Sequence, residues 1–494
     1  MMTALPASWL PLIAIAVPLL CVPLILFARR FPDVRETITL GGASLLIVIV
    51  ALLAWTLTLG PVVPLEVSGP IANLPLTLSV EPLGMIFALV ASFLWLVTTI
   101  YAVGYMRGHH EKNQTRFYVF FAIAIAATMG IAFAGDLMTL FIFYEVLTLS
   151  TFPLVTHAGT DEARRAGRLY LGILMGSSIG LFLVAIVVTY TVAGTLEFQH
   201  GGILAGKVEP ALAGLLLALY VFGIGKVAVM PLHRWLPAAM VAPTPVSALL
   251  HAVAVVKAGA FSVLKIATFI FGFDLLGSLT ATGLLQAVAA FTVIAASLVA
   301  LTKDNLKARL AYSTISQLSY IVLAALIADP AAFLGGGLHI ATHAFGKITL
   351  FFCAGAILVA AHKTDISQLD GMGRVMPFTF GAFLIGSLSL IGLPPFGGLW
   401  SKWLLIEGAL DTQQWILVAV FATSTLLNIA YLLPIPFRAF FRPLPEGASS
   451  RLHEAPMACL VAIAITSAGC VVLFFAPDPL IDLLARALTR QGSP

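Results

Sequence analysis

Long apolar runs follow one another along almost the whole chain, and they constrain its fold more than any other feature. Hydrophobic residues make up 60% of the 494 residues and charged residues only 10%, a balance that argues against a soluble enzyme. A helix needs about 20 apolar residues to cross a bilayer. With about 14 such runs, the sequence predicts an all-α polytopic membrane protein with about 14 transmembrane helices.

The limits of these runs place the expected helices. They span residues 8–28, 38–60, 81–106, 117–134, 136–156, 166–194, 211–231, 244–271, 280–302, 310–328, 333–361, 376–408, 413–440 and 456–476. The first is too long for the core of a signal peptide and is followed by further spans, so we expect it to be retained. The twelfth is long enough to form two half-helices.

Lysine and arginine are distributed unevenly between the loops that these helices define. Loops after odd-numbered helices carry 18 of the 26 positive residues, whereas loops after even-numbered helices, with the tail, carry 3. Because positive residues are enriched in cytoplasmic loops, this split predicts a multi-pass protein of the cell inner (cytoplasmic) membrane with both termini on the non-cytoplasmic side. It also supports the helix count, since one missed helix would mix the two sets.

One stretch combines an intramembrane charge with two helix breakers. It reads G-I-G-K-V-A-V-M-P-L-H-R-W-L-P and holds Lys226, Pro231 and Pro237. A charge at the bilayer centre costs about 2.5–3.5 kcal/mol on insertion scales, and such residues by default face a bundle interior or a water-filled cavity. A broken helix is tolerated there only where protein or water satisfies the freed backbone groups. Charge and break together indicate a transport pathway.

A second stretch of this kind lies in the twelfth expected helix and reads L-I-G-L-P-P-F-G-G-L-W-S-K-W. Paired interrupted helices in the two halves of a transporter point to its binding site. The order differs, because the lysine precedes the proline in the first stretch and follows it in the second. The breakers and the lysine of the second stretch are Pro394, Pro395, Gly397, Gly398 and Lys402.

An acidic residue, Glu145, lies in the apolar run of the fifth expected helix. If Glu145 approaches Lys226, the carboxylate keeps the lysine protonated; if the pair opens, desolvation favours the neutral amine and the lysine can release a proton. The pair would then act as a switch. The alternative is a static buried ion pair that fixes helix register, although such pairs are costly and often not stabilising.

Two histidines and a lysine share one face of the eleventh expected helix. His339, His343 and Lys347 occur at i, i+4 and i+8, within about 80° of one another around the helix. Histidine titrates near neutral pH and can pass a proton through either ring nitrogen, so the stripe is interpreted first as a proton relay. Polar helix packing is one alternative. A zinc site is another, but a third ligand is missing, and no metal is expected.

The eighth expected helix carries three further titratable residues. His251 and Lys257 lie about 120° apart around the helix and could bridge two layers of polar groups. Lys265 lies nearer the end of the span, and its long stem could carry the ammonium to the membrane interface, so we leave it out of the proton-transfer set. That set is Glu145, Lys226, His251, Lys257, His339, His343, Lys347 and Lys402.

Other chemistries lack their motifs. No G-x-x-x-x-G-K-[ST] loop is present, so no built-in ATPase drives the chain. The four cysteines lie in apolar runs without the spacing of an iron–sulfur cluster, and no cofactor is expected. A net charge of +4 without a basic cluster argues against nucleic acid. Gly335–Gly337 is expected to serve close helix packing, and Asp136 the N-terminal dipole of the fifth helix.

Five motifs, taken together, resemble a known family. They are the helix around Glu145 and the segments G-K-V-A-V-M-P-L-H-R-W-L-P, A-P-T-P-V-S-A-L-L-H-A-V-A-V-V-K-A-G, H-I-A-T-H-A-F-G-K and L-P-P-F-G-G-L-W-S-K. In this order they are similar to the antiporter-like, proton-conducting subunits shared by respiratory complex I, membrane-bound hydrogenases and Mrp-type cation/proton antiporters. The likeness covers nearly the whole chain.

The resemblance implies a fold and a site. It implies two inverted five-helix repeats, helices 4–8 and 9–13, each with a broken helix. Residues 1–110 would then hold the N-terminal helices, 111–275 and 276–442 the two repeats, and 443–494 the last helix and tail. It also implies a Glu145–Lys226 pair and a polar midplane axis that runs through Lys257, His339, His343 and Lys347 to an exit lysine at Lys402.

Among the members of the family, the chain resembles the D-type subunits of Mrp antiporters in its length, in the setting of Lys257 and in the S-K-W that ends the second broken stretch. The implied function is proton translocation in a multisubunit monovalent cation (sodium)/proton antiporter, with other membrane subunits as partners and no catalysis by this chain. The alternative is a proton-pumping membrane subunit of an NADH-quinone oxidoreductase (complex I) or of a membrane-bound hydrogenase. A third interpretation is a structural subunit with inert charges.

Overall fold

The computed structural model describes residues 6–71, 74–445 and 451–489. Within these ranges, 12 helical segments are long and apolar enough to cross a membrane. A helix satisfies its backbone hydrogen bonds internally, which is what a polypeptide surrounded by lipid requires. The chain is a multi-pass membrane protein built almost entirely from helices, as its composition predicts.

The elements of the first half of the chain are α1 (Leu10–Phe27), α2 (Pro32–Leu59), β1 (Leu65–Ile71), β2 (Leu74–Leu78), α3 (Pro82–Gly108), α4 (Gln114–Ala132), α5 (Leu137–Val155), α6 (Asp161–Ser177), α7 (Leu183–Ala193), α8 (Pro210–Gly223), α9 (Trp235–Ala238) and α10 (Thr244–Ala248). Those of the second half are α11 (Val255–Ile266), α12 (Phe273–Ser278), α13 (Thr280–Thr302), α14 (Leu306–Ile327), α15 (Pro330–Ala361), α16 (Pro377–Ile391), α17 (Gly398–Asp411), α18 (Trp415–Leu432), α19 (Pro434–Phe441), α20 (Met457–Phe475) and α21 (Asp478–Ala485).

Two apolar helices, α8 and α16, are shorter than a full span. The expectation of a continuous helix over 211–231 is wrong at its end, because α8 ends at Gly223 and the chain turns through Gly225–Val227. The expectation for 376–408 is confirmed, since α16 and α17 are two half-helices with a break between them. The total of 14 membrane crossings and the inverted repeats stay predictions.

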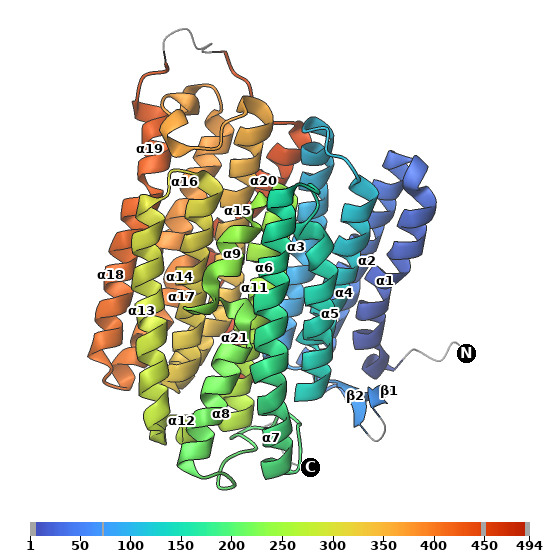
Figure 1. Ribbon diagram of the computed structural model, residues 1–494, viewed down its shortest axis with the longest axis vertical. Helices are drawn as coiled ribbons and strands as arrows, with labels where there is room; N and C mark the ends of the chain where they lie inside the picture. Colours follow the sequence, from blue (N-terminus) through green and yellow to red (C-terminus); the bar gives the residue numbers. More distant parts are fainter. Residues whose placement is uncertain (1–5, 72–73, 446–450, 490–494) are drawn as a thin grey trace.

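The helices run side by side in one bundle, with α1 and α2 at one side and α13 and α18 at the other (Figure 1). The segment Thr244–Phe271, which contains α10 and α11, is buried along its whole length. The long helix α15 packs against α3, α11, α14, α16, α17 and α20. Helices α11 and α15 therefore form the centre of the bundle.

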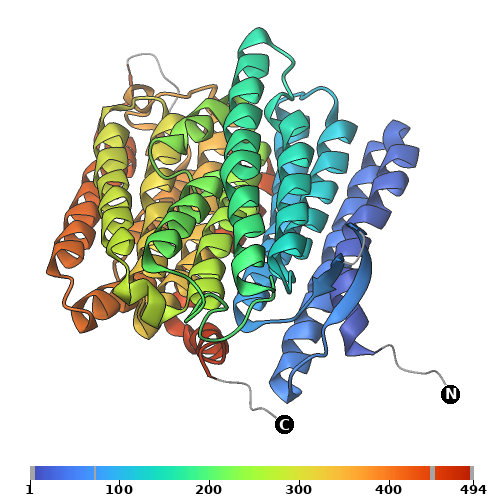
Figure 2. The same ribbon diagram turned by 60° about the horizontal axis from the view of Figure 1, so that its bottom comes forward.

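A two-stranded antiparallel hairpin interrupts the helical pattern between α2 and α3. Strands β1 and β2 pair Leu65 with Leu78 and Val67 with Leu76, and Leu78 also bridges to Ala134 in the turn between α4 and α5. The hairpin lies at the end of the bundle where α1 begins and α7 ends (Figures 1 and 2). The all-α expectation does not include it, because hydropathy alone assigns these residues to a loop.

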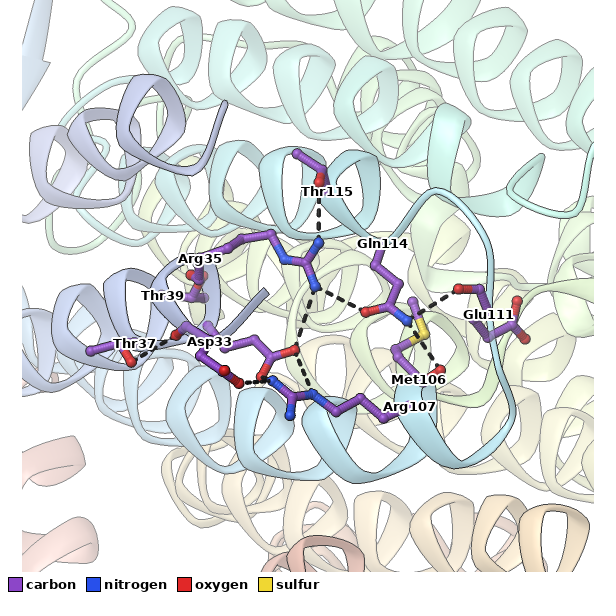
Figure 3. Close-up of polar contacts among 10 residues, drawn as sticks. Asp33, Arg35, Thr37, Thr39, Met106, Arg107, Glu111, Gln114 and Thr115 are labelled. Carbon is purple, nitrogen blue, oxygen red and sulfur yellow. Dashed lines mark hydrogen bonds and ion pairs between the residues drawn. The ribbon is translucent and has the colours of Figure 1, made fainter. Parts of the chain in front are cut away.

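At the opposite end of the bundle, an ion-pair network joins α2 to α3 and α4 (Figure 3). Arg107 lies 2.5 Å from Glu36, and Arg35 lies 3.4 Å from the same carboxylate and donates a 2.9 Å hydrogen bond to Gln114. Arg35 and Glu36 are each only 4% exposed. The sequence places both arginines in loops, but Arg35 lies in the first turns of α2 and Arg107 in the last turn of α3.

Two structural roles predicted from the sequence are confirmed. The Asp136 carboxylate accepts the backbone N–H of Thr139 at 2.8 Å and so caps the N-terminus of α5. A Cβ atom on Gly335 would lie 2.9 Å from the backbone nitrogen of Leu405 and 3.0 Å from the carbonyl oxygen of Ser401. Helix α17 therefore packs directly on the backbone of α15, which only a glycine at this position permits.

Candidate functional site: buried lysines and histidines at the bundle centre

The first helix break puts Lys226 in a short irregular turn. Helix α8 ends at Gly223, and Lys226 lies in the 3-10 turn Gly225–Val227, where its side chain is completely buried. Pro231 follows in the same irregular stretch, whereas Pro237 lies inside the short helix α9. The break that the sequence predicts is present, and Pro231 rather than Pro237 belongs to it.

Side chains supply the hydrogen bonds that the broken backbone lacks. The indole Nε1 of Trp235 donates to the carbonyl of Gly225 at 3.0 Å, and the backbone N–H of Lys226 donates to the hydroxyl of Tyr144 at 3.1 Å. Gly259 of α11 lets this turn approach closely, since a Cβ there would lie 2.5 Å from the backbone nitrogen of Val227. The freed groups are thus satisfied by protein, as irregular backbone within a membrane requires.

The ammonium of Lys226 lies against α5. Its Nζ donates to Thr148 Oγ1 at 2.6 Å and to the carbonyl oxygen of Tyr144 at 2.8 Å, and it lies 3.1 Å from the centre of the Tyr144 ring. Tyr144 and Thr148 are four residues apart and share one face of the helix. A carbonyl, a hydroxyl oxygen and an aromatic face all attract a cation. Helix α5 therefore holds the Lys226 charge without a carboxylate.

Glu145 follows Tyr144 on α5 and does not contact Lys226. Both carboxylate oxygens are buried and have no hydrogen-bond partner among the described residues, and no ion pair joins them to the Lys226 ammonium there. Glu145 is three residues before Thr148, on a neighbouring part of the same helix surface, so the Lys226 ammonium is near the carboxylate without bonding to it. The direct pair implied by the resemblance is open in this structure.

Lys257, His343 and His339 form the centre of the polar region. Lys257 Nζ lies 2.5 Å from His343 Nδ1, and the rings of His343 and His339 are 5.6 Å apart between their centres. His339 Nδ1 lies 2.9 Å from Ser401 Oγ on α17. All of these residues are at most 2% exposed. The arrangement joins α11, α15 and α17 through polar contacts inside an apolar bundle.

Lys347 lies on the same helix as the two histidines but contacts α14. Its Nζ donates to Ser313 Oγ at 2.8 Å and to the carbonyl oxygen of Leu310 at 3.3 Å. The hydroxyl of Tyr431 on α18 donates to the same Ser313 Oγ at 3.0 Å. The predicted stripe is therefore divided: the histidines face α11 and α17, and the lysine leads toward α18.

The second break positions Lys402. Its Nζ donates to the carbonyl oxygen of Ile391, the last residue of α16, at 2.9 Å. A lysine is favourable there, because the C-terminus of a helix carries a partial negative charge. The ammonium also lies 5.3 Å from the centre of the Tyr320 ring, which in turn stacks on His339 at 5.7 Å. Tyr320 thus lies between His339 and Lys402.

The predicted breakers of this segment all lie in or next to the turn between α16 and α17. Pro394 and Pro395 are within the turn, and the N–H of Gly397 donates to the carbonyl of Cys470 on α20 at 2.9 Å. Gly398 begins α17, and a Cβ there would collide with the carbonyl oxygen of Ser389. The absence of a side chain at Gly398 lets the two half-helices meet.

His251 stands apart from these contacts. It lies in a π-helical turn, Leu249–Val253, and is completely buried. Neither ring nitrogen has a hydrogen-bond partner among the described residues, and the ring lies 4.8 Å from that of Phe351. In the described ranges, no cluster of three or more His, Cys, Asp or Glu side chains could hold a metal ion.

Lys265 has a partner that the sequence-based expectation of an interfacial lysine does not include. The residue is completely buried, its Nζ donates to the carbonyl of Ala134 at 2.6 Å, and it lies 2.8 Å from a carboxylate oxygen of Glu81. Distance from the end of an apolar run does not reveal such a partner, because Glu81 precedes α3 and lies far away in the sequence. The structure brings them together at the hairpin end of the bundle.

Known proteins resemble this chain in sequence. Residues 134–428 match the family model described as NADH:quinone oxidoreductase/Mrp antiporter, transmembrane, and residues 68–118 match the N-terminus of NADH-ubiquinone oxidoreductase (complex I) chain 5. The chain is 32% identical over 482 residues to the N subunit of the NADH-quinone oxidoreductase of Desulforudis audaxviator, covering 94% of this chain and 95% of that protein.

Two further comparisons cover most of the chain. It is 28% identical over 467 residues to the D subunit of the Na(+)/H(+) antiporter of Alkalihalophilus pseudofirmus, covering 93% of this chain and 92% of that protein. A chain in the Mrp complex of Dietzia sp. superposes with a TM-score of 0.86 at 23% identity, covering 98% of this chain and 97% of that chain, which shows a shared fold. The first family model covers more than half of the sequence, and the protein belongs to the NADH:quinone oxidoreductase/Mrp antiporter transmembrane family.

Proposed function

We propose that this chain translocates protons as a subunit of a multisubunit monovalent cation/proton antiporter, with sodium as the exchanged cation. The observation that carries the proposal is the 2.5 Å contact between Lys257 and His343 at the buried centre of the bundle. Two proton-binding nitrogens at this distance can exchange a proton. Burial of ionisable side chains in an apolar bundle is costly, and such residues by default mark ion or proton pathways. The similarity along the chain to the D subunit of an Na(+)/H(+) antiporter agrees with this function.

The proposed route follows the buried titratable side chains. Protons enter near Glu145 and Lys226, pass His251 and reach Lys257, and they leave at Lys402. His343, His339 and Tyr320 connect Lys257 to Lys402 by the ring contacts described above. Water molecules bridge the gaps between stations that are not in contact, and Lys347 with Ser313 forms a side branch toward α18.

The open Glu145–Lys226 pair supplies the proposed gate. When the carboxylate approaches, it stabilises the lysine charge; when it withdraws, the ammonium depends on Thr148 and the Tyr144 carbonyl alone. One charge crossing a potential of 100 mV is worth about 2.3 kcal/mol. Exchanging a carboxylate for neutral acceptors changes the energy of a buried ammonium on this scale.

The proposal includes an environment and partners. We place the chain in the cell inner membrane with both termini on the non-cytoplasmic side, because positive residues concentrate in the other set of loops. Other membrane subunits of the complex are its partners. Residues 111–275 and 276–442 are proposed as two inverted repeats, since each contains one broken segment with a lysine beside the break.

The test uses the assembled complex in inverted membrane vesicles, with proton movement followed by a pH-sensitive dye after addition of sodium. Glu145→Ala and Lys226→Ala are each expected to lower exchange at least tenfold at unchanged amounts of assembled complex. Lys207→Ala removes an exposed lysine and serves as the control. Wild-type exchange in both site variants, with normal assembly, would disprove the proposed route.

A second candidate function is a proton-pumping membrane subunit of an NADH-quinone oxidoreductase. The observation in its favour is the 32% identity to the N subunit of an NADH-quinone oxidoreductase over nearly the full length of both chains. Purification of the intact complex distinguishes the two candidates. Co-purifying flavin and iron, with proton movement driven by NADH, would identify the redox complex; sodium-driven proton movement without them would identify the antiporter.

A further inference from the structure

A cavity opens at the hairpin end of the bundle, the end turned forward in Figure 2. Its volume is about 760 Å³, and its walls include Glu81, Phe198, His200, Phe269 and Arg486. A neighbouring cavity of about 270 Å³ shares His200 and Phe269 with it and adds Asp274. Three charged or titratable side chains therefore line the larger cavity and a fourth lines its neighbour, and both spaces are large enough for several water molecules.

The carboxylate of Glu81 connects this cavity to a buried lysine. Glu81 lines the cavity and is partly exposed, while Lys265, 2.8 Å from its carboxylate, is completely buried. The Lys265 ammonium also lies 4.3 Å from the centre of the Phe198 ring, a second wall residue. Lys265 thus stands directly behind the cavity wall, in contact with two of its residues.

Lys265 is also on the helix that carries the central Lys257. Both belong to α11, eight residues apart, so they share one face of the helix at about 12 Å along its axis. Phe261 lies between them on this face, and its ring centre is 5.5 Å from the Lys265 ammonium. Phe261 is therefore the α11 side chain between the two lysines on this face, and the ring of Phe87 on α3 packs against it at 5.2 Å between ring centres.

We infer that the Glu81–Lys265 pair is a proton-exchange station through which Lys257 communicates with water at the hairpin end of the bundle. The inference rests on the proposed proton translocation and adds a route to one face of the membrane. Phe261 is the barrier in this route, and displacement of its ring admits the water that completes it.

One proton passes from the cavity to Lys257 in three steps. The Glu81 carboxylate takes a proton from hydronium, forming an O–H bond and releasing water, so that the pair carries one net positive charge. Lys265 then gives one N–H proton through bridging water to a neutral Lys257 amine. The Glu81 carboxyl returns its proton to the Lys265 amine, which restores the pair. One proton has moved from the cavity to Lys257, and each step is reversible.

Cysteine labelling tests whether the cavity is aqueous. Ser79 lines the cavity, and all four native cysteines are buried. In the assembled complex, Ser79→Cys is expected to react with a membrane-impermeant maleimide from one side of the vesicle membrane only. Ser92→Cys, buried on α3, is the unreactive control. Absence of labelling at Ser79→Cys from both sides would overturn the inference.

Exchange assays test the pair itself. Glu81→Gln is expected to lower sodium-driven proton movement at least tenfold. The double variant Glu81→Gln/Lys265→Met removes both charges. If the ion pair has only a structural role, this variant should recover both assembly and exchange relative to Glu81→Gln. The inference predicts recovered assembly with exchange still at least tenfold lower, and recovery of exchange overturns it. Lys265→Arg, which keeps the positive charge but cannot release a proton, covers a failure of the neutral variants to assemble. The inference predicts at least tenfold lower exchange in this variant, and wild-type exchange overturns it.

A Lys226→Ala arm in the same assay separates the two proposals. If Lys226→Ala and Glu145→Ala both assemble and exchange normally, the proposed route fails. If Lys226→Ala is inactive while Glu81→Gln exchanges normally, the proposed function stands and the station at the cavity is wrong.

Discussion

Lys257 Nζ and His343 Nδ1 lie 2.5 Å apart, and this one hydrogen bond joins α11 to α15 where both helices are buried. The other ring nitrogen of His343, Nε2, has no hydrogen-bond partner among the described residues. A proton gained or lost by either partner therefore changes the contact between the two central helices of the bundle.

A double-mutant cycle should measure this contact. Lys257→Met and His343→Leu, alone and together, are expected to be non-additive in thermal stability, with a coupling energy of about 0.5–3 kcal/mol for residues in direct contact. Lys257→Met combined with a substitution of the distant, exposed Lys207 should be additive within about 0.5 kcal/mol. Additive effects in the first cycle would contradict the hydrogen bond.

Gly259→Ala should disturb the helix break around Lys226 without removing any charged side chain. The added Cβ would lie 2.5 Å from the backbone nitrogen of Val227 and 2.7 Å from the carbonyl carbon of Lys226. We expect a loss of about 1–3 kcal/mol of stability from overpacking, together with slower exchange. Gly176→Ala on α6 has no neighbour within 4 Å and should be neutral or stabilising by up to about 1 kcal/mol. Equal melting temperatures of the two variants would argue against the close approach.

The carboxylates at the α2–α3 end should differ sharply in importance. The Glu36 side chain is 5% exposed and that of Asp33 is 88% exposed, although both contact Arg107. Glu36→Gln leaves two arginines near a neutral group and should cost about 3–5 kcal/mol, as expected when one partner of a buried pair is removed. Asp33→Asn should cost less than about 1 kcal/mol. Thermal unfolding in detergent measures both, and similar losses would count against the burial argument.

His157, in the turn between α5 and α6, should make stability depend on pH. Burial, assisted by nearby Arg116, lowers the pKa of the imidazole below its usual value of about 6.5. The folded state therefore disfavours protonation, so this stability is complete above pH 6.5 and is lost as the pH falls through the lowered pKa. His157→Gln should flatten the decline in melting temperature between pH 7.5 and about 5. An unchanged slope in His157→Gln would refute the assignment.

The sequence predicts the parts of this molecule that depend on local composition. Apolar length locates the spans, and Pro231, Pro394 and Pro395 fall within the two breaks, because these signals act within one segment. The partner of a buried lysine depends on how distant segments pack together, and the sequence does not predict this partner reliably. Lys226 is expected beside Glu145 and instead contacts Thr148 and the Tyr144 carbonyl.

For Lys265, the sequence fails to predict a partner that the structure shows. Its position near the end of an apolar run suggests an interfacial lysine, yet Glu81 reaches it from the start of α3. The hairpin of β1 and β2 escapes prediction for a related reason, since two short strands between long apolar runs are not distinguished from a loop by hydropathy. The spacing of His339 and His343 does predict a shared face, and the ring contact follows from it.

The bond from Lys402 to the carbonyl of Ile391 makes a side chain part of the end of a helix. If that ammonium gives up its proton, it offers a weaker donor to the last carbonyl of α16, and the dipole of the half-helix loses the charge that faces it. The protonation state of this one side chain therefore affects how strongly the C-terminus of α16 is stabilised. A neighbouring protein packed against α16 could sense the state of Lys402 through that helix without contacting the lysine.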